Sequence, residues 1–205
     1  MSKNPIIVFE GIEGSGKTTH INFISRYFKA HNYNFLQIRE PGGSKNSEKI
    51  RKLLLSNKSN FNTKTDLLLY FASRSENMHN VVKKNHKKKI ILIDRFIDST
   101  VAYQHFGMGI NKEIINKINK FLLGKIKPNL TILNLVSKKN LLKRLRIRKN
   151  KNRYDKFNMN FYNKVQNGFL KLANQKIKSY QIINSNLDIK FNEKLILKKI
   201  DKLIF

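Results

Sequence analysis

The chain has 205 residues, no cysteine, and 42 lysines and arginines against 13 acidic residues, which gives a formal net charge of +29. A chain without cysteine forms no disulfide, holds no metal through thiolates and has no cysteine nucleophile. Its apolar runs are far shorter than the about 20 residues of a membrane-spanning helix, so we expect no membrane partner and a cytoplasmic location.

The first half of the chain alternates short apolar runs with amphipathic segments. Ile6–Phe9 is rich in β-formers and is followed at once by glycines, which predicts a buried parallel strand. The other elements expected before residue 94 are helices over Thr18–Ala30 and Ser47–Leu55, a helix from Thr65 to about Lys84, and strands over Asn34–Arg39 and Ile90–Ile93. The charge run Lys83–Lys89 is expected to be a solvated turn.

The second half continues the same alternation. It predicts a helix that starts within Ser99–Tyr103, helices over Lys112–Leu123, Lys138–Arg148, Asn160–Asn174 and Asn192–Leu203, and strands over Asn129–Leu135 and Ser179–Asn184. Strands alternating with helices indicate βαβ units, hence an α/β fold whose parallel sheet is covered on both faces. No linker or repeat divides the chain, so we expect residues 1–205 to form one domain.

A glycine-rich loop follows the first strand. Gly11 to Thr18 (GIEGSGKT) fits the phosphate-binding pattern G-x-x-x-x-G-K-[ST], the P-loop, between a predicted strand and a predicted helix. Backbone N–H groups of such a loop cradle phosphate oxygens, and the following helix adds its positive end. The residues expected to bind ATP are Gly11, Ile12, Glu13, Gly14, Ser15, Gly16, Lys17, Thr18 and Thr19.

A nucleoside triphosphate also needs a metal ion, for which the sequence offers two oxygen ligands. The Thr18 hydroxyl is the P-loop ligand of Mg²⁺, and Asp94 ends the most apolar strand, where a second ligand is expected. A turn or helix-capping aspartate is the alternative for Asp94. The sequence therefore predicts an ATP site with Mg²⁺ as cofactor.

An arginine-rich segment suggests a kinase of small molecules. Four arginines, Arg144, Arg146, Arg148 and Arg153, fall within ten residues at the end of a predicted helix. Guanidinium groups stabilise the charge of a phosphoryl group in transfer, as the closing lid of a kinase does, although a solvated basic helix face remains the alternative. A GTPase is disfavoured because the guanine-reading N-K-x-D motif is missing.

Three further blocks carry a family resemblance. With the P-loop and the arginine-rich segment, Arg39–Gly43 (REPGG), Tyr70–Arg74 (YFASR) and Asp94–Gln104 (DRFIDSTVAYQ) resemble thymidylate kinases, in the order of that family and over about residues 5 to 185. The resemblance implies the phosphorylation of dTMP to dTDP by ATP. It also implies a P-loop nucleoside monophosphate kinase-like fold with a five-stranded parallel sheet, a lid over about residues 144–156, and a homodimer.

The resemblance assigns roles residue by residue. It implies that dTMP binds to Glu13, Pro41, Arg51, Tyr70, Arg74, Arg95, Thr100, Tyr103 and Gln104, and that the catalytic residues are Lys17, Arg95, Arg148 and Arg153. Glu13 would face the deoxyribose 3′-OH, and Tyr70, where most relatives have Phe, would stack on thymine. Some relatives carry a basic residue at the position of Gly14, so here the Arg144–Arg153 segment would supply that charge. Adenine is expected near Asn184-Ser185.

Two other functions stay open on the sequence. A kinase of a different nucleotide or deoxynucleoside would share these motifs. A basic P-loop ATPase acting on nucleic acid would use the +29 charge to displace counterions from phosphates, but would have no use for the Tyr70–Arg74 pair. The abundance of Lys, Asn and Ile is also the outcome of drift toward A and T in the coding sequence, so we expect no nucleic-acid partner.

Overall fold

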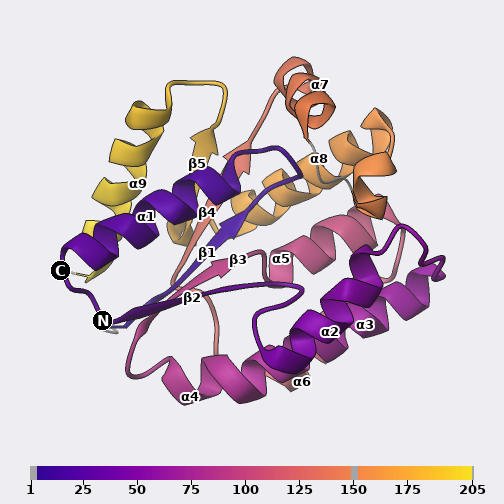
Figure 1. The fold of residues 1–205 in the computed structure, drawn as a ribbon, viewed down its shortest axis with the longest axis horizontal. Coiled ribbons are helices and arrows are strands. Elements are labelled where there is room, and N and C mark those ends of the chain that lie inside the picture. Colours follow the sequence, from indigo (N-terminus) through magenta and orange to yellow (C-terminus); the bar gives the residue numbers. More distant parts are fainter. Residues whose placement is uncertain (1–3, 149–151, 205) are drawn as a thin grey trace.

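The computed structural model describes residues 4–148 and 152–204. Five parallel strands form one sheet in the order β2-β3-β1-β4-β5. Their bounds are β1 Ile6–Glu10, β2 Phe35–Arg39, β3 Ile90–Asp94, β4 Leu130–Leu135 and β5 Tyr180–Asn184. The prediction of a five-stranded parallel sheet between helices is confirmed (Figure 1).

Helices connect the strands and cover both faces of the sheet (Figure 1). They are α1 Lys17–Ala30, α2 Lys45–Leu55, α3 Thr63–Asn77, α4 Lys83–Asn85, α5 Ile97–Thr100, α6 Lys112–Leu123, α7 Lys138–Ile147, α8 Met159–Gln175 and α9 Ile189–Ile204. Two π-helical segments, η1 Met78–Val82 and η2 Val101–Gly107, and two 3₁₀ turns, η3 Arg153–Lys156 and η4 Ile177–Ser179, complete the chain. Among the described residues, we find no helix with the length and hydrophobicity needed to cross a membrane.

Alternation along the strands decides which helix covers which face. On β1, Ile7 and Phe9 pack with the apolar residues of α1 and α9. Their neighbours Ile6 and Val8 point to the opposite face, where they meet η1 and α6. Because successive strand side chains point to opposite faces, a strand buried on both sides is apolar throughout, as the sequence of β1 predicted.

The sheet register brings three loops together at one edge. β1 lies in the centre and pairs with β3 through Phe9 and Asp94, and with β4 through Glu10 and Leu133. Parallel strands all end at the same edge of the sheet, which is where α/β folds bind ligands. The P-loop, the residues after β3 and the loop after β5 therefore lie side by side.

Helix boundaries depart from the predictions where a capping residue or a change of helix type intervenes. The third helix starts at Thr63, two residues before the expected start, because the Asn62 side chain accepts hydrogen bonds from the N–H groups of Lys64 and Thr65. The segment expected to begin a helix within Ser99–Tyr103 begins it at Ile97 and becomes π-helical from Val101. Periodicity does not predict a π-helix, which is frequent at functional sites.

A close helix contact holds η2 in place. Gly168 in α8 faces Phe106 of η2, and a Cβ atom at this glycine would lie 2.5 Å from the Phe106 ring. The contact matters for function because η2 carries Tyr103 and Gln104.

We expect Gly168→Ala to destabilise the fold by about 1–3 kcal/mol, the cost of overpacking a tight contact. Helix propensity alone would favour alanine by up to about 1 kcal/mol, so the sign separates the two effects. The measurement is urea unfolding, with Asn167→Ala, an exposed neighbour on α8, as the control. A Gly168→Ala variant as stable as the wild type would contradict the packing described here.

Candidate active site

The P-loop connects β1 to α1 and has the conformation that its glycines allow. Gly11, Gly14 and Gly16 have φ angles of 139°, 68° and 94°, in the region that side chains other than glycine avoid. At Gly11 a Cβ atom would lie 2.4 Å from the carbonyl oxygen of Asn134. Of the residues predicted to bind ATP, Glu13, Gly14, Gly16, Lys17, Thr18 and Thr19 line the cavity described below. Gly11, Ile12 and Ser15 do not, and the Ile12 side chain packs in the core.

The Lys17 amine is folded into the loop. Its Nζ donates to the carbonyl oxygens of Gly11 and Ile12, at 2.9 Å and 2.8 Å. Burial first, and then the positive charge of Arg95, lower the pKa of Lys17 to about 8, although the acids nearby oppose the shift. A phosphate in the loop would give this amine an anionic partner in place of neutral carbonyls.

The two predicted metal ligands face the same cavity. Thr18 and Asp94 both line it, and Asp94 Oδ1 is buried with no hydrogen-bond partner among the described residues. A buried carboxylate oxygen without a partner is costly, so a cation at this place would satisfy it. Residues 4–148 and 152–204 contain no group of three or more acids or histidines that could hold a metal ion. Mg²⁺ usually takes only one or two protein carboxylates and keeps waters and substrate phosphates as its other ligands.

Glu13, the acid within the P-loop, is paired. Its Oε1 accepts from Arg95 Nη2 at 2.9 Å, and its Oε2 accepts from the Tyr103 hydroxyl. Burial raises the pKa of Glu13, but Arg95 and Lys17 outweigh burial and hold this pKa below its usual range. Glu13 is therefore a carboxylate acceptor for a hydroxyl group, which is the chemistry expected of a contact to a sugar.

Arg95 has a strained backbone and a central place. Its φ angle of 67° is uncommon for a residue with a side chain, and it turns the guanidinium back toward β1. Nη1 donates to the carbonyl oxygen of Gly11 at 3.0 Å, and the guanidinium lies 5.2 Å from the centre of the Tyr103 ring. Arg95 thus ties the P-loop to the segment after β3.

Glu10 is a second buried acid that sequence reasoning missed. Its Oε1 accepts from the backbone N–H groups of Phe96, at 2.8 Å, and Ser99, at 3.1 Å. Burial, together with the charge of Asp98, raises the pKa of Glu10 to about 7. The residue does not line the cavity, so we assign it to holding the Arg95–Ser99 turn against β1. It sits in an apolar run, and no pattern in the sequence distinguishes it.

Arg74 is predicted to read the base and is 2% exposed. Its Nε donates to Glu40 at 2.8 Å, Nη1 donates to Asn119 at 2.7 Å, and Nη2 donates to the Phe96 carbonyl and the Thr100 hydroxyl at 3.0 Å and 2.9 Å. These four bonds use four of its five N–H groups. Arg74 lines the cavity, and most of its hydrogen bonding holds the surrounding walls.

The other residues predicted for the base lie around Arg74. Pro41, Tyr70, Thr100 and Gln104 all line the cavity. Burial raises the pKa of Tyr70 to about 12, and a hydrogen bond with the Tyr154 side chain partly opposes the rise. Gln104 is 1% exposed, and its Nε2 has no partner among the described residues. An amide donor of this kind suits the carbonyl oxygen of a nucleobase.

Three further arginines, Arg51, Arg144 and Arg148, line the rest of the cavity. Arg51 Nη1 donates to the Pro41 carbonyl oxygen at 2.6 Å. Arg144 and Arg148 line the cavity, and Arg144 joins α7 to the P-loop by donating to the carbonyl oxygens of Gly14, at 2.9 Å, and Ser185, at 2.7 Å. The expectation that the arginine segment supplies charge beside Gly14 therefore has a structural basis in Arg144, which was not among the predicted site residues.

Arg153, predicted to be catalytic, is placed elsewhere. It does not line the cavity and instead donates to the Leu54 carbonyl oxygen and to Asp66. The physical reason is a buried acid on α3, 4% exposed, whose attraction for the guanidinium no spacing in the sequence shows. The lid residues 149–151 lie outside the described residues.

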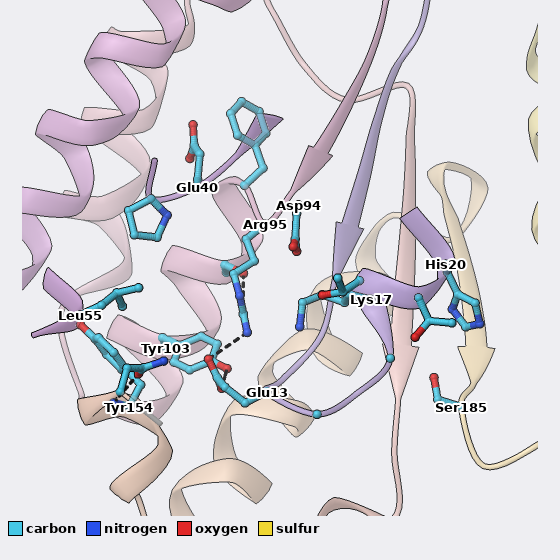
Figure 2. A pocket seen from close by; sticks show the side chains of 18 of the residues that line it. Glu13, Lys17, His20, Glu40, Leu55, Asp94, Arg95, Tyr103, Tyr154 and Ser185 are labelled. Atoms are coloured by element: carbon cyan, nitrogen blue, oxygen red, sulfur yellow. Dashed lines mark hydrogen bonds and ion pairs between the residues drawn. The ribbon is translucent and has the colours of Figure 1, made fainter. Parts of the chain in front are cut away.

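The residues said above to line the cavity surround a single volume of about 580 Å³. Figure 2 shows Glu13, Lys17, Asp94 and Arg95 in its middle, with Tyr103, Tyr154 and Leu55 to one side and His20 and Ser185 to the other. The second side is completed by Leu187 and Ile189, which are 50% and 53% exposed. The phosphate-binding loop thus lies at the middle of one cavity that extends to both sides of it.

The sheet order, the P-loop and the two-sided cavity define a P-loop nucleoside monophosphate kinase. The family model described as thymidylate kinase matches residues 9–196. The chain belongs to the thymidylate kinase family.

Individual relatives agree along nearly the whole chain. The thymidylate kinase of Sulfurihydrogenibium sp. (strain YO3AOP1) is 40% identical over 193 residues, which cover 93% of this chain and 94% of the relative. That of Mycoplasma capricolum is 39% identical over 202 residues, or 95% of both chains. The crystal structure of thymidylate kinase from Ehrlichia chaffeensis superposes with a TM-score of 0.80 at 31% identity, and covers 97% of this chain and 98% of that one.

Proposed function

We propose that the chain transfers the γ-phosphoryl group of ATP to the 5′-phosphate of dTMP, giving dTDP and ADP, a step toward dTTP for DNA replication. The observation that carries this proposal is the position of Arg95, which lies in one cavity between the P-loop and the pocket around Tyr70 and Gln104. An oxygen of the dTMP phosphate forms a bond to the γ-phosphorus while the bond to the oxygen of ADP breaks. The acceptor is already anionic near neutral pH, so no general base is needed.

On the donor side, the P-loop would hold the phosphates and the far pocket would hold adenine. Leu187 and Ile189 offer an apolar wall to a base, and Ser185 faces the same pocket. Mg²⁺ would be held by Thr18 and Asp94, and when bound it would neutralise charge on the phosphates. Lys17 would leave the loop carbonyls for the β- and γ-phosphates.

On the acceptor side, each group suits one part of dTMP. Tyr70 would stack on thymine, and Gln104 would donate to a thymine carbonyl, with Arg74, Thr100 and Pro41 around them. Glu13 would accept from the 3′-OH, while Tyr103 beside it would crowd a ribose 2′-OH. Arg51 and Arg95 would hold the 5′-phosphate.

The lid would supply charge to the transferring group. We propose that residues 1–205 act as one kinase domain with a lid over about 144–156, in which Arg148 and Arg144 face the phosphates. This assignment moves the second lid cation from Arg153 to Arg144, because Arg144 lines the cavity and Arg153 does not. A cytoplasmic location remains a prediction.

The test of the proposed function is a coupled assay of ADP formation with ATP, Mg²⁺ and a panel of acceptors. We expect dTMP to be preferred over dUMP and dCMP, and thymidine to be inert because it lacks the phosphate that Arg51 and Arg95 would hold. Equal rates on all monophosphates would favour a kinase of broader specificity. ADP formation that DNA stimulates and dTMP does not would refute the proposed kinase activity.

The finer proposal on partners is a homodimer. Exposed apolar side chains gather on α2, α3 and α6, which pack next to one another: Leu53, Leu68, Ile114 and Phe121, the last 83% exposed. Exposed large apolar side chains on neighbouring helices are typical of an interaction site, and a second copy of the chain is the partner proposed.

Phe121→Glu is expected to convert the dimer to a monomer, because the new carboxylate would be desolvated in the interface. Light scattering after size exclusion measures the mass. The control is Phe191→Glu on α9, where the phenylalanine is also exposed, at 50%, but lies outside the proposed interface, and this variant should stay dimeric. A wild-type protein with the mass of one chain, 24.1 kDa, would refute the dimer.

A further inference from the structure

Both carboxylate oxygens of Asp66 are occupied by residues from a distant part of the chain. Arg153 Nη2 donates to Oδ1, and the Tyr154 hydroxyl donates to Oδ2 at 3.2 Å. Arg153 Nε also donates to the Leu54 carbonyl oxygen at the end of α2. The C-terminal part of the lid is thereby fastened to both α2 and α3.

The ion pair between Asp66 and Arg153 is largely buried. The Asp66 and Arg153 side chains are 6% and 15% exposed. The guanidinium lies 5.7 Å from the centre of the Phe61 ring and 4.9 Å from that of Tyr154. Three hydrogen bonds hold Arg153 and Tyr154 against α2 and α3, and removing either partner of a buried ion pair leaves a costly unpaired charge.

This position places an aromatic wall on the acceptor pocket. Tyr154 is 3% exposed and lines the cavity. Its ring centre lies 6.1 Å from that of Tyr70, in an edge-on arrangement at 69°, and Figure 2 shows it beside Leu55 at the acceptor end. The Tyr162 hydroxyl holds the Tyr154 carbonyl oxygen at 2.9 Å. Asp66 and Arg153 do not line the cavity, so they act on a ligand through neighbours that do: Tyr154, which donates to Asp66, and Leu55, which follows the Leu54 carbonyl bonded to Arg153.

We infer that Asp66 is a positioning residue for dTMP: it holds Arg153 and Tyr154 against α2 and α3 and so completes the wall of the thymine pocket. Arg153 is then its partner in positioning rather than a group that touches the phosphates. The inference rests on the proposed function and goes beyond it, because it names two residues that govern acceptor binding without touching the acceptor.

The donor pocket provides an internal standard. His20 and Ser185 lie at the far end of the cavity (Figure 2), outside α2, α3 and the segment of Tyr154. Loss of the Asp66 contacts should therefore weaken dTMP binding and leave nucleotide binding at the P-loop unchanged. A general loss of stability would weaken both ligands together, which separates a positioning role from a merely structural one.

The test is a double-mutant cycle of Asp66→Asn, Arg153→Gln and the double variant, with the dissociation constants of dTMP and ADP measured by calorimetry. Each single change should weaken dTMP binding by about tenfold. Because both changes remove the Arg153–Asp66 contact, the loss in the double variant should be well below the product of the two single losses. ADP binding should stay within about twofold. Glu76→Gln removes an acid at the other end of α3, where its partners are Asn46 and Asn80, and is the matched control.

Two outcomes would overturn the inference: dTMP affinities unchanged in both singles, or independent effects that multiply in the double variant. If Asp66→Asn does not fold, the test uses Arg153→Gln and Arg153→Lys. Lysine restores the charge but cannot bridge Leu54 and Asp66 as the guanidinium fork does. A dTMP affinity of Arg153→Gln equal to that of the wild type would refute the positioning role. A wild-type enzyme that phosphorylates dTMP while the cycle fails would refute the inference alone. A wild type without dTMP turnover would refute the proposed function and the inference with it.

Discussion

Lys17→Ala should lower the turnover of dTMP by about a hundred- to a thousandfold, the cost of removing one preorganised donor from a site of phosphoryl transfer. The Lys17 amine is 6% exposed and is held by two carbonyl oxygens of the loop it would serve. Because the lysine acts on charge that develops in the transition state, the loss should appear mainly in kcat. The measurement is a steady-state assay with both substrates varied.

The matched control is Lys29→Ala, which removes the same charge from the exposed last turn of α1, and we expect it to keep wild-type turnover. A pH series adds a second readout. Since the pKa of Lys17 is lowered to about 8 in the ligand-free protein, the cation is present below this pH and is lost above it. The kcat/KM for ATP, which reports ionisation of the free enzyme, should therefore fall above about pH 8 and stay level in Lys17→Arg, whose charge persists. A Lys17→Ala enzyme that retains its turnover would contradict the P-loop assignment.

Arg74→Met should destabilise the fold by about 3–5 kcal/mol, because it strands Glu40, a buried acid, without its partner. Arg74 is 2% exposed and Glu40 is 5% exposed, at 2.8 Å from each other. The same change removes the group predicted to read thymine, so dTMP binding should also weaken. Urea unfolding followed by circular dichroism gives the first effect, and calorimetry at low temperature gives the second.

The pH dependence of the stability loss tests whether the unpaired Glu40 carboxylate causes it. Burial raises the pKa of Glu40 above its reference value of 4.5, and Arg74 opposes the rise. The folded protein therefore keeps the Glu40 proton to higher pH than the unfolded chain, and the stability that this carboxyl contributes is lost as the pH rises. Without Arg74 the pKa rises further, so Arg74→Met should be more destabilised at about pH 7 than at about pH 5.

The control for the stability effect of Arg74→Met is the double variant that combines it with Glu40→Leu. Replacing both members of a buried ion pair by apolar groups is often nearly neutral, so the double variant should be more stable than Arg74→Met alone. Additive losses in the double variant would mean that the pair is not the cause of the effect.

Much of the fold was predictable because local signals agreed with one another. The run Ile6–Phe9, the P-loop and the following amphipathic segment each predicted their element, and all five strands fall where apolar runs placed them. The π-helical turn over Val101–Gly107 was not predictable, because apolar periodicity does not distinguish a π-helix from an α-helix; it packs against α8 at Gly168. Likewise α9 begins at Ile189, three residues before the predicted start, in a stretch where apolar side chains remain exposed.

The site was predictable where a motif places residues along the chain, and not where buried charges choose partners across it. Lys17, Thr18, Tyr70 and Gln104 line the cavity, and their roles toward substrates stay predictions. Arg153 shows the limit, since four nearby arginines look alike in the sequence and only the buried Asp66 separates them. Arg144 was equally hidden, because its partners are backbone carbonyl oxygens, which carry no sequence signal.

The central claim is that this cavity transfers a phosphoryl group between two nucleotides. The most direct measurement follows ATP labelled in its γ-phosphoryl group in the presence of Mg²⁺ and dTMP, with the products separated by chromatography. We predict that the label appears in dTDP, that ADP and dTDP form in equal amounts, and that both depend on dTMP. Label released as inorganic phosphate, at a rate that dTMP does not change, would contradict the account.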